Sequence, residues 1–463
     1  MGLLCVHGWG AVAVAPGGVH RDPSSSPTET VNSRAGASGI VGLVSAESQP
    51  GFPSPGFTRF WWGGAVSSFG TYVTLLVLQT LVLVNLRGTT QDVGWLNSAR
   101  WLPYLLFGLV VGALVDRRRR RPVLVATDLV QAVLLVSIPV TWTVGVLSVP
   151  LLLVIVTFYG TASLVNGAAS MSVIPRLVPA QHLQRAHSRI DSADAAAQTT
   201  GPALAGLLMK FIGAPLAVLI DAATYLFSAV MIATVPLRES PATSSDSRTN
   251  LRREIIEGLK WVYRGSGLAT LAVATHIWFA ANAILGTVLA PFVLVTLALS
   301  PLQLGIITAL GGVGGLLGAT TSGIGGRRLG TGGAIITGHA ASAVGVGVMV
   351  LAGLGNQGWV AVAVVGLGQA FHGFGIGFSN SHEMSYRQTR TPDELQARTN
   401  TTMRSFNRAV IVVVAPLAGL LAVHTNVRVA LILSGTIFAA TAILLAVSPL
   451  RRTGRRPLAP TIR

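Results

Sequence analysis

The sequence predicts an all-α integral membrane protein whose twelve transmembrane helices form two pseudo-symmetric six-helix bundles. Three observations support this fold class. Hydrophobic residues make up 51% of the chain and charged residues only 11%, with a mean hydropathy of +0.62, whereas soluble proteins carry about 25% charged residues. From Phe57 onward, apolar stretches long enough to cross about 30 Å of hydrocarbon recur between short polar breaks. Landmarks of the first half of the chain also return in the second half at a fixed spacing.

The excess of positive charge does not indicate a nucleic-acid partner. The formal charge is +17, but the basic residues fall in predicted loops and tails rather than on one face interleaved with aromatic residues. No phosphate loop of the Gly-x-x-x-x-Gly-Lys-Ser/Thr type occurs in the sequence, which excludes a nucleotide partner. Cys5 is the single cysteine, and His276 and His372 lack the ligand spacing of a metal site. We therefore expect no nucleic acid, nucleotide, metal or other cofactor.

Residues 1–56 are predicted to form a disordered N-terminal tail, because they are rich in Gly, Pro, Ser and Thr. A signal peptide is an alternative, but no basic residue precedes Leu3, and Gly8 and Gly10 interrupt the apolar run. Over-prediction of the start codon is another alternative. The sequence thus leaves open whether these residues belong to the native protein.

The membrane part divides six plus six around a polar interval. We expect an N-terminal bundle over 57–237, a cytoplasmic linker over 238–266, a C-terminal bundle over 267–449 and a basic cytoplasmic tail over 450–463. The linker contains an amphipathic stretch, Leu251 to Tyr263, that predicts an interfacial helix, with a solvated linker helix as the alternative. The predicted spans are 59–84, 92–115, 122–145, 148–173, 188–211, 214–236, 268–296, 302–325, 331–354, 358–382, 397–422 and 426–448.

Arginine in the loops predicts the orientation. Basic residues next to a span are held on the cytoplasmic side, and an even number of spans places both termini on one side. The outside loops contain only Arg87, Lys210 and Arg428. The inside loops and tail are rich in arginine, namely 117–121, 176, 185, 189, 238–264, 327, 328, 387, 390, 398, 451, 452, 455 and 456. The sequence therefore predicts a multi-pass protein of the plasma (inner) membrane with both termini in the cytoplasm.

The two halves of the chain resemble each other, as in transporters built from internal repeats. The second-half landmarks follow the first at an offset of 213 residues: Gly112 and Gly325, Pro179 and Pro392, Arg185 and Arg398. This repetition predicts a substrate site between the two bundles near the membrane midplane.

Several motifs resemble the major facilitator superfamily. Gly112-Ala113-Leu114-Val115-Asp116-Arg117, followed by further arginines, is similar to that family's signature between helices two and three. The segments 178–187, 201–206, 219–226, 251–259 and 391–398 resemble the branch of bacterial drug, macrolide and siderophore exporters, which includes enterobactin-exporter-like proteins. The resemblance implies the major facilitator fold, alternating access and a small-molecule substrate.

The basic loop is a candidate gate. A helix N-terminus favours an anion, so Asp116 could accept the free N–H groups that open helix eleven near Arg398. By resemblance, this contact would latch the inside closed; a simple loop-capping role is the alternative. The sequence departs from the signature at Arg119, where a Gly is usual, and at Gly325, whose copy has no Asp. The predicted gating residues are Gly112, Asp116, Arg117, Arg120 and Arg121.

Few charges lie within the predicted spans, and each needs a partner or a role because its insertion costs about 2.5–3.5 kcal/mol. Arg100 and Asp221 reach similar depth, so we expect either a structural ion pair or a role in proton exchange or substrate contact. Asp128 lies within reach of the 117–121 arginines and is expected to neutralise them. Glu383 is interpreted as an interfacial residue at the inner end of helix ten.

Uncharged polar residues supply candidates for the cavity, although a lone one is more often a helix-to-helix hydrogen bond. The helix-five stretch formed by Gly201, Pro202 and Gly206 is in part similar to an antiporter motif. The cavity candidates are Gln79, Asn166, His276, Asn282, Gln369 and Arg404, with His372, Asn407 and Arg408 beside them.

Together these features predict a secondary active transporter that exports a small amphipathic organic compound, with the lipid bilayer as surroundings and protons as the coupling ion. A metabolite or siderophore importer of the same fold is the alternative, because residues do not reveal direction. A non-transporting membrane sensor or scaffold is the alternative from another class. No nucleophile, base and oxyanion set converges in the sequence, so we do not expect an enzyme.

Overall fold

The computed structural model describes residues 52–116, 118–237, 251–265, 267–355 and 357–453, and these residues are helical without strands. Most of the predicted N-terminal tail (1–51), the first part of the predicted linker (238–250) and most of the predicted basic tail (454–463) lie outside the described residues. The first bundle contains α1 (Pro55–Thr80), α2 (Thr90–Asp116), α3 (Arg120–Thr143), α4 (Val149–Leu177) and α5 (Leu183–Ala233). The rest contains α6 (Leu251–Lys260), α7 (Ala269–Pro291), α8 (Pro301–Val350), α9 (Gly358–Thr389), α10 (Asp393–His424) and α11 (Val427–Val447).

Short turns extend several of these helices, and local sequence explains where helices begin. Ser54 caps α1 and Ser300 forms a capping box with Gln303 at α8; in both cases proline follows the cap, where its missing N–H costs nothing. The π-helical turns are Leu81–Asn85, Trp261–Gly265 and Phe292–Thr296, and the 3-10 turns are Ala180–His182 and Pro449–Arg452.

Two helices are twice the length of a membrane span. With 51 and 50 residues, α5 and α8 would each measure about 75 Å, against about 30 Å of hydrocarbon. Each contains one glycine with non-helical backbone, Gly213 (φ 78°, ψ 163°) and Gly330 (φ 73°, ψ 168°), a conformation that glycine adopts readily. Each is therefore two spans that meet at a single glycine. Nine helices of the described residues are long and apolar enough to cross a membrane. Dividing α5 and α8 gives eleven spans, and α2, with 27 residues, makes the fold consistent with twelve.

The ends of the predicted domains shift by a few residues. The predicted tail ends at 56, but α1 already begins at Pro55, and Gly56 packs against Leu177 and Pro236. Likewise Leu450 is buried, and a Cβ on Gly332 would clash with its carbonyl oxygen. The first residues of the predicted basic tail therefore pack on the C-terminal bundle.

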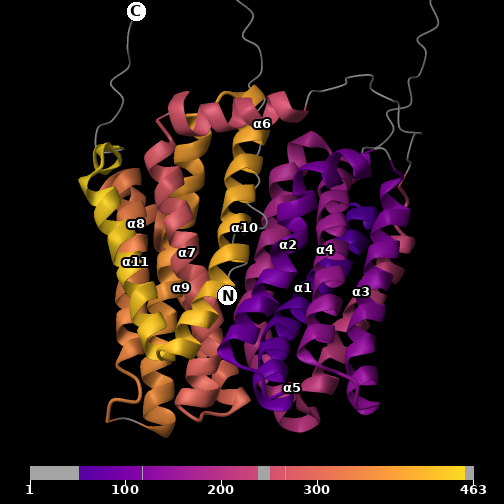
Figure 1. Cartoon of the computed structure of the whole chain (residues 1–463). Helices are drawn as coiled ribbons and strands as arrows, with labels where there is room; N and C mark the ends of the chain where they lie inside the picture. The colour runs from indigo at the N-terminus through magenta and orange to yellow at the C-terminus, as the bar shows by residue number, and fades with distance from the viewer. Residues whose placement is uncertain (1–51, 117, 238–250, 266, 356, 454–463) are drawn as a thin grey trace, which may run out of the picture.

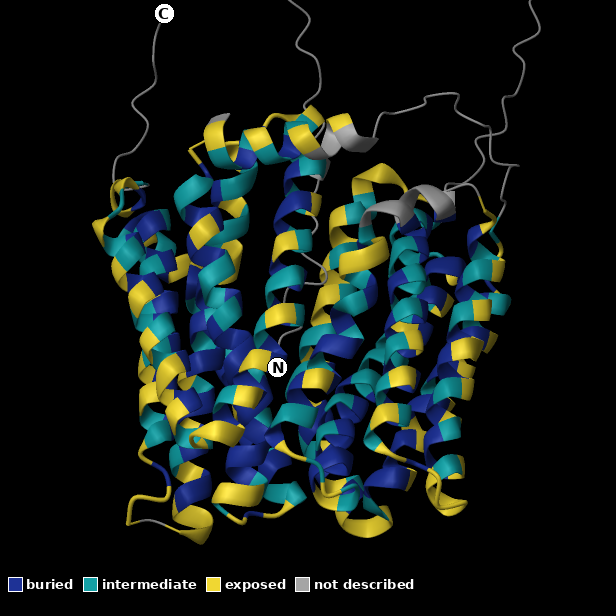
Figure 2. Ribbon diagram, in the orientation of Figure 1, coloured by how far each residue is buried: buried dark blue, intermediate teal, exposed yellow. Residues whose placement is uncertain are grey.

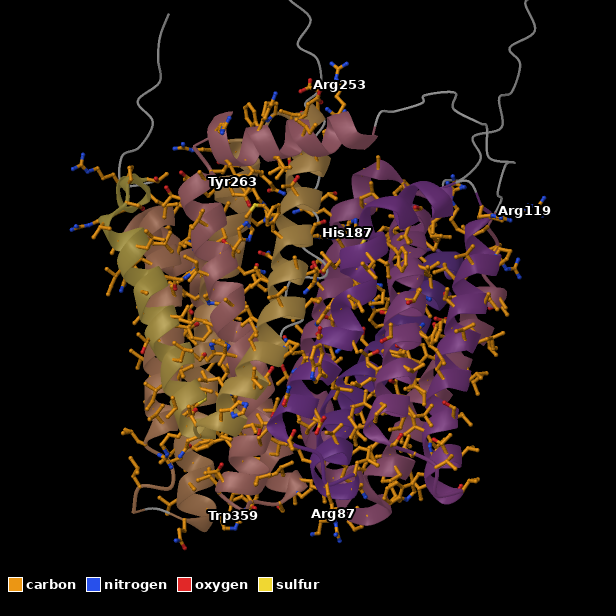
Figure 3. The ribbon with its side chains drawn as sticks, viewed as in Figure 1. Arg87, Arg119, His187, Arg253, Tyr263 and Trp359 are labelled. Carbon is orange, nitrogen blue, oxygen red and sulfur yellow. The ribbon has the colours of Figure 1, made fainter. Side chains whose placement is uncertain are left out.

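The two bundles stand side by side, with α1–α5 in one and α7–α11 in the other (Figure 1). Helix α6 lies across one end, which we call the linker end; Arg253 and Arg119 also lie there, whereas Arg87 and Trp359 mark the opposite end (Figure 3). Exposed residues cover the outside of the bundles (Figure 2). Many of them are large and apolar, such as Phe211 and Val447, as expected where the solvent is lipid.

Buried apolar residues are distributed differently at the two ends. At the opposite end, one cluster contains residues of both halves, for example Val93 and Leu304. At the linker end, one cluster around Phe57 and Val173 belongs to the N-terminal half, and a separate one around Leu271 and Tyr386 belongs to the C-terminal half. The halves are thus packed together at the opposite end and packed separately at the linker end.

Candidate functional site

Close backbone contacts join the halves at the opposite end, along a surface that we call the seam. A Cβ on Gly305 of α8 would lie 2.5 Å from the Pro202 carbonyl oxygen of α5, and one on Gly419 of α10 would lie 2.6 Å from the Gln91 Cα of α2. These distances exclude any side chain, so small residues allow the helices to touch. The seam glycines are Gly94, Gly206, Gly305, Gly312 and Gly419.

Hydrogen bonds add to the seam. The Ser98 hydroxyl donates to the Val412 carbonyl oxygen at 2.8 Å. The Asn97 amide contacts the Gly286 carbonyl oxygen at 3.4 Å and the Thr287 hydroxyl at 3.3 Å. Both donors lie on α2 of the N-terminal half, so they link it to α10 and α7 of the other half.

A cavity of about 80 Å³ lies between the halves, on the linker-end side of the seam. It draws on α1 and α5 from one half and on α7, α8 and α9 from the other. All its lining side chains are uncharged. They are Tyr72, Leu75, Leu76, Gln79, Gln198, Pro202, Trp278, Phe279, Leu289, Ala290, Leu304, Thr308 and Ile376, with glycines 286, 311, 312 and 373 between them. The space therefore suits an apolar molecule with a few hydrogen-bonding groups.

Trp278 connects this cavity to the polar interior of the C-terminal half. Its ring stacks on the ring of buried His372 (6.1 Å between centroids, 12° between planes). Its other neighbours are Phe438 at 5.7 Å and His339 at 6.4 Å, both edge-on. A molecule in the cavity would contact Trp278 directly and these side chains through it.

The predicted ion pair between Arg100 and Asp221 is not formed in the described structure. Arg100 lies over the ring of Trp101, 5.3 Å from its centroid, and buried Arg408 of α10 covers the same ring at 3.8 Å. Two guanidinium groups, one from each half, thus approach the ring of Trp101 on α2, as in cation–π contacts. Equal depth in the membrane does not place two side chains on facing sides of their helices.

Asp221 instead belongs to a polar layer inside the N-terminal half. It is fully buried, accepts a hydrogen bond from Thr224 at 3.1 Å, and packs so closely on Gly70 of α1 that a Cβ there would clash. Next to it, the Tyr225 hydroxyl contacts those of Tyr159 (2.8 Å) and Thr71 (3.0 Å). Its hydrogen-bond partners are thus neutral groups, and Arg100 acts on it only through its charge at longer range.

The structure gives Asp128 a neutral hydrogen-bond partner, and its predicted neutralisation of the basic loop stays a prediction because Arg117 lies outside the described residues. Its Oδ1 accepts a hydrogen bond from the Asn166 amide at 2.7 Å, and that amide also contacts Thr127 at 2.9 Å. The same contact removes Asn166 from the cavity, because its amide is used between α3 and α4. Asp128 lies eight residues after Arg120, the first residue of α3, so it is buried about two turns away from the arginines at the helix end.

The other predicted site residues divide between cavity and packing roles. Gln79 and Pro202 line the cavity, whereas Gly201 packs on the Tyr72 Cβ and Gly206 lies in the seam. The remaining candidates are found elsewhere. His276 contacts the Tyr263 hydroxyl and the Asn407 amide oxygen, both at 2.7 Å. Asn282 contacts His372 at 3.3 Å, and Gln369 is fully buried beside Met349. Arg404 lies on α10 outside the cavity lining.

The predicted gate is only partly described. The side chains of Asp116 and Arg117 lie outside the described residues, as does the local environment of Gly112. Arg118 and Arg119 are exposed at the linker end (Figure 3), and Arg120 is buried at the start of α3, with Arg121 half-buried beside it. The latch therefore stays a prediction.

Helix α10 begins at Asp393, so its free N–H groups lie in that first turn and not near Arg398 as expected. Helix α6 packs beside α10 just past this turn. A Cβ on Gly258 would lie 2.6 Å from the Thr402 hydroxyl of α10, so the two helices touch. Glu257 forms ion pairs with Arg398 of α10 and, at 2.8 Å, with Arg253 one turn earlier. The hydrogen bond from Arg253 and the charge of Arg398 lower the pKa of Glu257, and its slight desolvation opposes them.

A buried histidine–glutamate contact was missed by the sequence analysis. His339 of α8 lies 3.2 Å from Glu383 of α9, whereas Glu383 was expected at the interface. Histidine and acidic residues in neighbouring predicted spans were the available signal. No group of three His, Cys, Asp or Glu side chains converges within the described ranges.

Comparison with known proteins agrees with this architecture. The family model described as Major Facilitator Superfamily matches residues 60–413. The uncharacterized MFS-type transporter y4rN of Sinorhizobium fredii is 28% identical over 53% of this chain and 60% of its own length. Macrolide efflux protein A of Streptococcus pyogenes is 27% identical over 48% of this chain and 55% of its own length. The multidrug efflux pump Tap of Mycolicibacterium fortuitum is 26% identical over 54% of this chain and 62% of its own length. The chain thus matches a little more than half the length of these relatives.

Solved structures share the fold. The nucleoside transporter NupG aligns with a TM-score of 0.69 at 12% identity, over 84% of this chain and 98% of that one. A bacterial homologue of the iron transporter ferroportin in the inward-facing state aligns with a TM-score of 0.65 at 18% identity, over 84% and 98%. At these identities the likeness is one of fold alone.

Proposed function

Because this chain belongs to the major facilitator superfamily, we propose that it is a secondary transporter that exports a small amphipathic organic compound, such as a drug, a macrolide or a siderophore-like molecule, in exchange for protons. One observation carries the proposal: an uncharged cavity lies between two bundles that share apolar clusters toward the opposite end and beside the cavity, but have separate clusters at the linker end. That is the arrangement required for alternating access. The macrolide and multidrug efflux relatives support export over import.

The orientation follows from charge. The linker helix and exposed Arg119 lie at the linker end (Figure 3), as does the basic end of the chain that follows α11 (Figure 1). Arginines next to a span remain in the cytoplasm. The structure would then be open to the cytoplasm and closed toward the outside, ready to take up its cargo. Both chain ends would be cytoplasmic.

Within this cycle, the seam is the outer gate and the loop at Asp116 is the inner latch. The seam closes by contact between glycine-lined helices. The latch would close when Asp116 reaches the first turn of α10, which precedes the Arg398 that pairs with Glu257 of α6. Because α6 is held beside α10 by this pair, it would move together with α10 when the inside closes.

The test is export from cells. Bacteria with and without the protein are loaded with ethidium, a fluorescent cationic dye, or with erythromycin, a macrolide, and loss of each compound is followed before and after an uncoupler collapses the proton gradient. We expect faster loss with the protein and no difference after the uncoupler. Uptake in place of loss would indicate an importer. No movement of any compound across a wider panel of dyes and antibiotics would favour a sensor or scaffold.

A further inference from the structure

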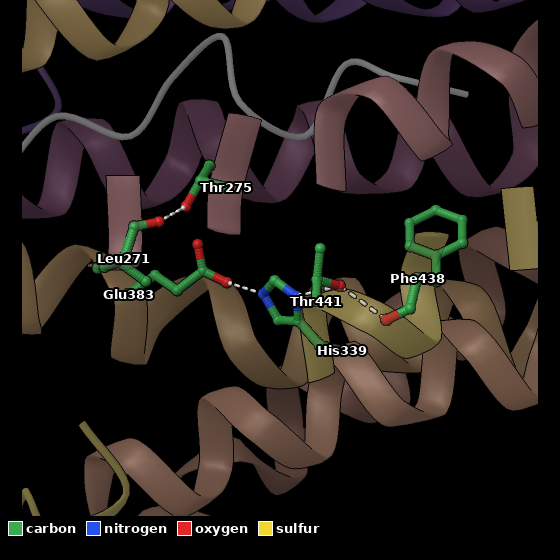
Figure 4. A network of polar contacts seen from close by, with 6 residues as sticks. All are labelled: Leu271, Thr275, His339, Glu383, Phe438 and Thr441. Atoms are coloured by element: carbon green, nitrogen blue, oxygen red, sulfur yellow. Dashed lines mark hydrogen bonds and ion pairs between the residues drawn. The ribbon is translucent and has the colours of Figure 1, made fainter. Parts of the chain in front are cut away.

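Three side chains form a polar relay inside the C-terminal bundle (Figure 4). His339, in the second part of α8, is 2% exposed and lies between two partners. Its Nδ1 is 3.2 Å from the hydroxyl of Thr441 on α11, and its Nε2 is 3.2 Å from Oε1 of Glu383 on α9. The relay is nine residues beyond Gly330, which is about 13 Å into the span.

The geometry determines which ring nitrogen carries a proton. The Thr441 hydroxyl donates its one hydrogen to the Phe438 carbonyl oxygen at 2.7 Å. It must therefore accept from His339, so Nδ1 carries a hydrogen. Nε2 then faces the Glu383 carboxyl group, and these two atoms can share one further proton.

That further proton changes the charge of the pair by one unit. Without it, neutral His339 faces the Glu383 carboxylate, and the pair has a charge of −1. With it, the pair is neutral overall, whether the proton is on the ring or on the carboxyl group. A net charge in this position is costly, so the two protonation states differ strongly in how they fit the surrounding bundle.

Other charged groups near the pair are engaged elsewhere. On α9, His382 contacts Ser322 and Arg387 contacts Met384. On α7, His276 faces α10, and on α11, Arg428 caps the Val350 and Ala352 carbonyl oxygens near the opposite end. The remaining such groups on the packed helices are His372 beside Trp278, Tyr386 in the apolar cluster at the linker end, and Arg327 and Arg328, exposed at the linker end.

The pair also connects the cavity to the linker end. The ring of Trp278, which lines the cavity, lies edge-on to His339. Ile376 lines the cavity two helical turns before Glu383 on α9. The Glu383 side chain is 21% exposed, against 2% for His339. A proton could therefore reach the pair through Glu383 while His339 responds to the occupant of the cavity.

We propose that the His339–Glu383 pair is the proton-binding site of this transporter. The inference rests on the proposed function for its role in export, but proton binding itself can be measured alone. In the state described here, a proton shared by Nε2 and Oε1 leaves through Glu383 to water at the linker end. In the state open to the other side, one proton from water returns to the same two atoms.

The direct test is infrared spectroscopy of the purified protein in lipid, titrated between about pH 5 and about pH 8, the range in which histidine titrates. Spectra of the parent are compared with Glu383→Gln, and Glu257→Gln serves as the matched control at an exposed carboxylate. We expect a pH-dependent carboxyl or imidazole band that Glu383→Gln removes and Glu257→Gln retains. Identical titration spectra in the parent and Glu383→Gln would overturn the proposal. If Glu383→Gln fails to fold, His339→Gln gives the same comparison through the ring bands.

The second test separates coupling from transport in proteoliposomes with radiolabelled erythromycin. Glu383→Gln should lose accumulation driven by a pH gradient by at least about tenfold, while exchange of labelled for unlabelled erythromycin continues, because exchange needs no net proton movement. Accumulation equal to the parent would overturn the proposal. If the parent moves no erythromycin, the export proposal fails for this compound, and the infrared titration still decides whether the pair binds a proton.

Discussion

The seam and the linker end hold the same two bundles by different chemistry. At the seam, backbone touches backbone at glycines such as Gly305, and one apolar cluster runs across both halves. At the linker end each half has its own apolar cluster, and charged groups are concentrated there, including the Glu257–Arg398 pair. The seam therefore depends on shape, whereas the linker end depends on charge.

This difference matters for a gate. Most of the described contacts across the seam join uncharged groups, and Arg408 over Trp101 is a charged exception. Such a seam can separate while leaving few bare charges in the membrane, each of which would cost several kcal/mol. Charges near the water boundary remain solvated when their partners leave, and their attraction weakens with salt. We thus expect steric changes to act mainly on the seam and changes of charge, pH or salt mainly on the linker end.

The largest effect is expected from Gly305→Leu. The new side chain would have to fit where even a Cβ lies 2.5 Å from the Pro202 carbonyl oxygen. Overpacking costs about 1–3 kcal/mol, so the closed seam should become about tenfold or more rarer. Spin labels at Val146 and Trp359, exposed at the opposite end of the two halves, should move apart in distance measurements.

Gly347→Leu is the matched control for this substitution. It makes the same change in the same helix, but nothing lies within 4 Å of a Cβ at Gly347, so the label distances should equal those of the parent. Equal distances in Gly305→Leu as well would show that backbone contact does not control the seam.

A smaller effect on the same distances is expected from Trp101→Phe. The substitution weakens the cation–π contact of Arg408, worth about 0.5–2 kcal/mol for a desolvated pair, and keeps an aromatic ring between the halves. The open population should rise by less than in Gly305→Leu. Trp62→Phe, at an exposed tryptophan of α1, is the control and should change nothing. A response of Trp101→Phe larger than that of Gly305→Leu would contradict a seam based on shape.

At the linker end, Asp116→Asn should leave expression intact and reduce transport severalfold. A neutral amide keeps the shape of the carboxylate but loses its attraction to the helix N-terminus, which is worth about 0.3–1 kcal/mol. Asp191→Asn, at an exposed acidic residue of α5, is the control. Unchanged transport in Asp116→Asn would mean that the loop with Arg119 does not form a latch.

The sequence predicts more of the fold than of the candidate site. Spans were predictable because each needs about twenty apolar residues, and the predicted breaks at 211–214 and 325–331 contain Gly213 and Gly330. The form of these two turns could not be predicted, because a single glycine replaces each expected loop.

Contacts between helices were the part that the sequence could not give. Depth along a helix follows from residue number, but the direction of a side chain around the axis depends on packing, so Arg100 and Asp221 do not meet. Glu383 was missed because its helix runs to Thr389 instead of the predicted 382. Seven added residues, about 10 Å of helix, move this carboxyl group from the interface into the bundle beside His339.

The smallest effect concerns α6 and follows from the lowered pKa of Glu257. A carboxyl group whose pKa is lower in the folded protein stabilises the docked helix above the usual glutamate pKa of about 4.3. This contribution is complete at neutral pH and is lost as the pH falls through the lowered value. A spin label at exposed Ile256 should therefore gain mobility only in acid, or at about 1 M salt, where the screening length is about 3 Å.

In Glu257→Gln the label should already be mobile at neutral pH and insensitive to both conditions. Arg253→Gln keeps the pair of Glu257 with Arg398, so the mobility of the label in this variant should lie between those of the parent and Glu257→Gln. The effect is small because these groups are near water, where ion pairs contribute little. A label equally immobile in Glu257→Gln and in the parent would mean that the contact of Gly258 with Thr402, and not charge, holds α6 on α10, and the linker end would then resemble the seam.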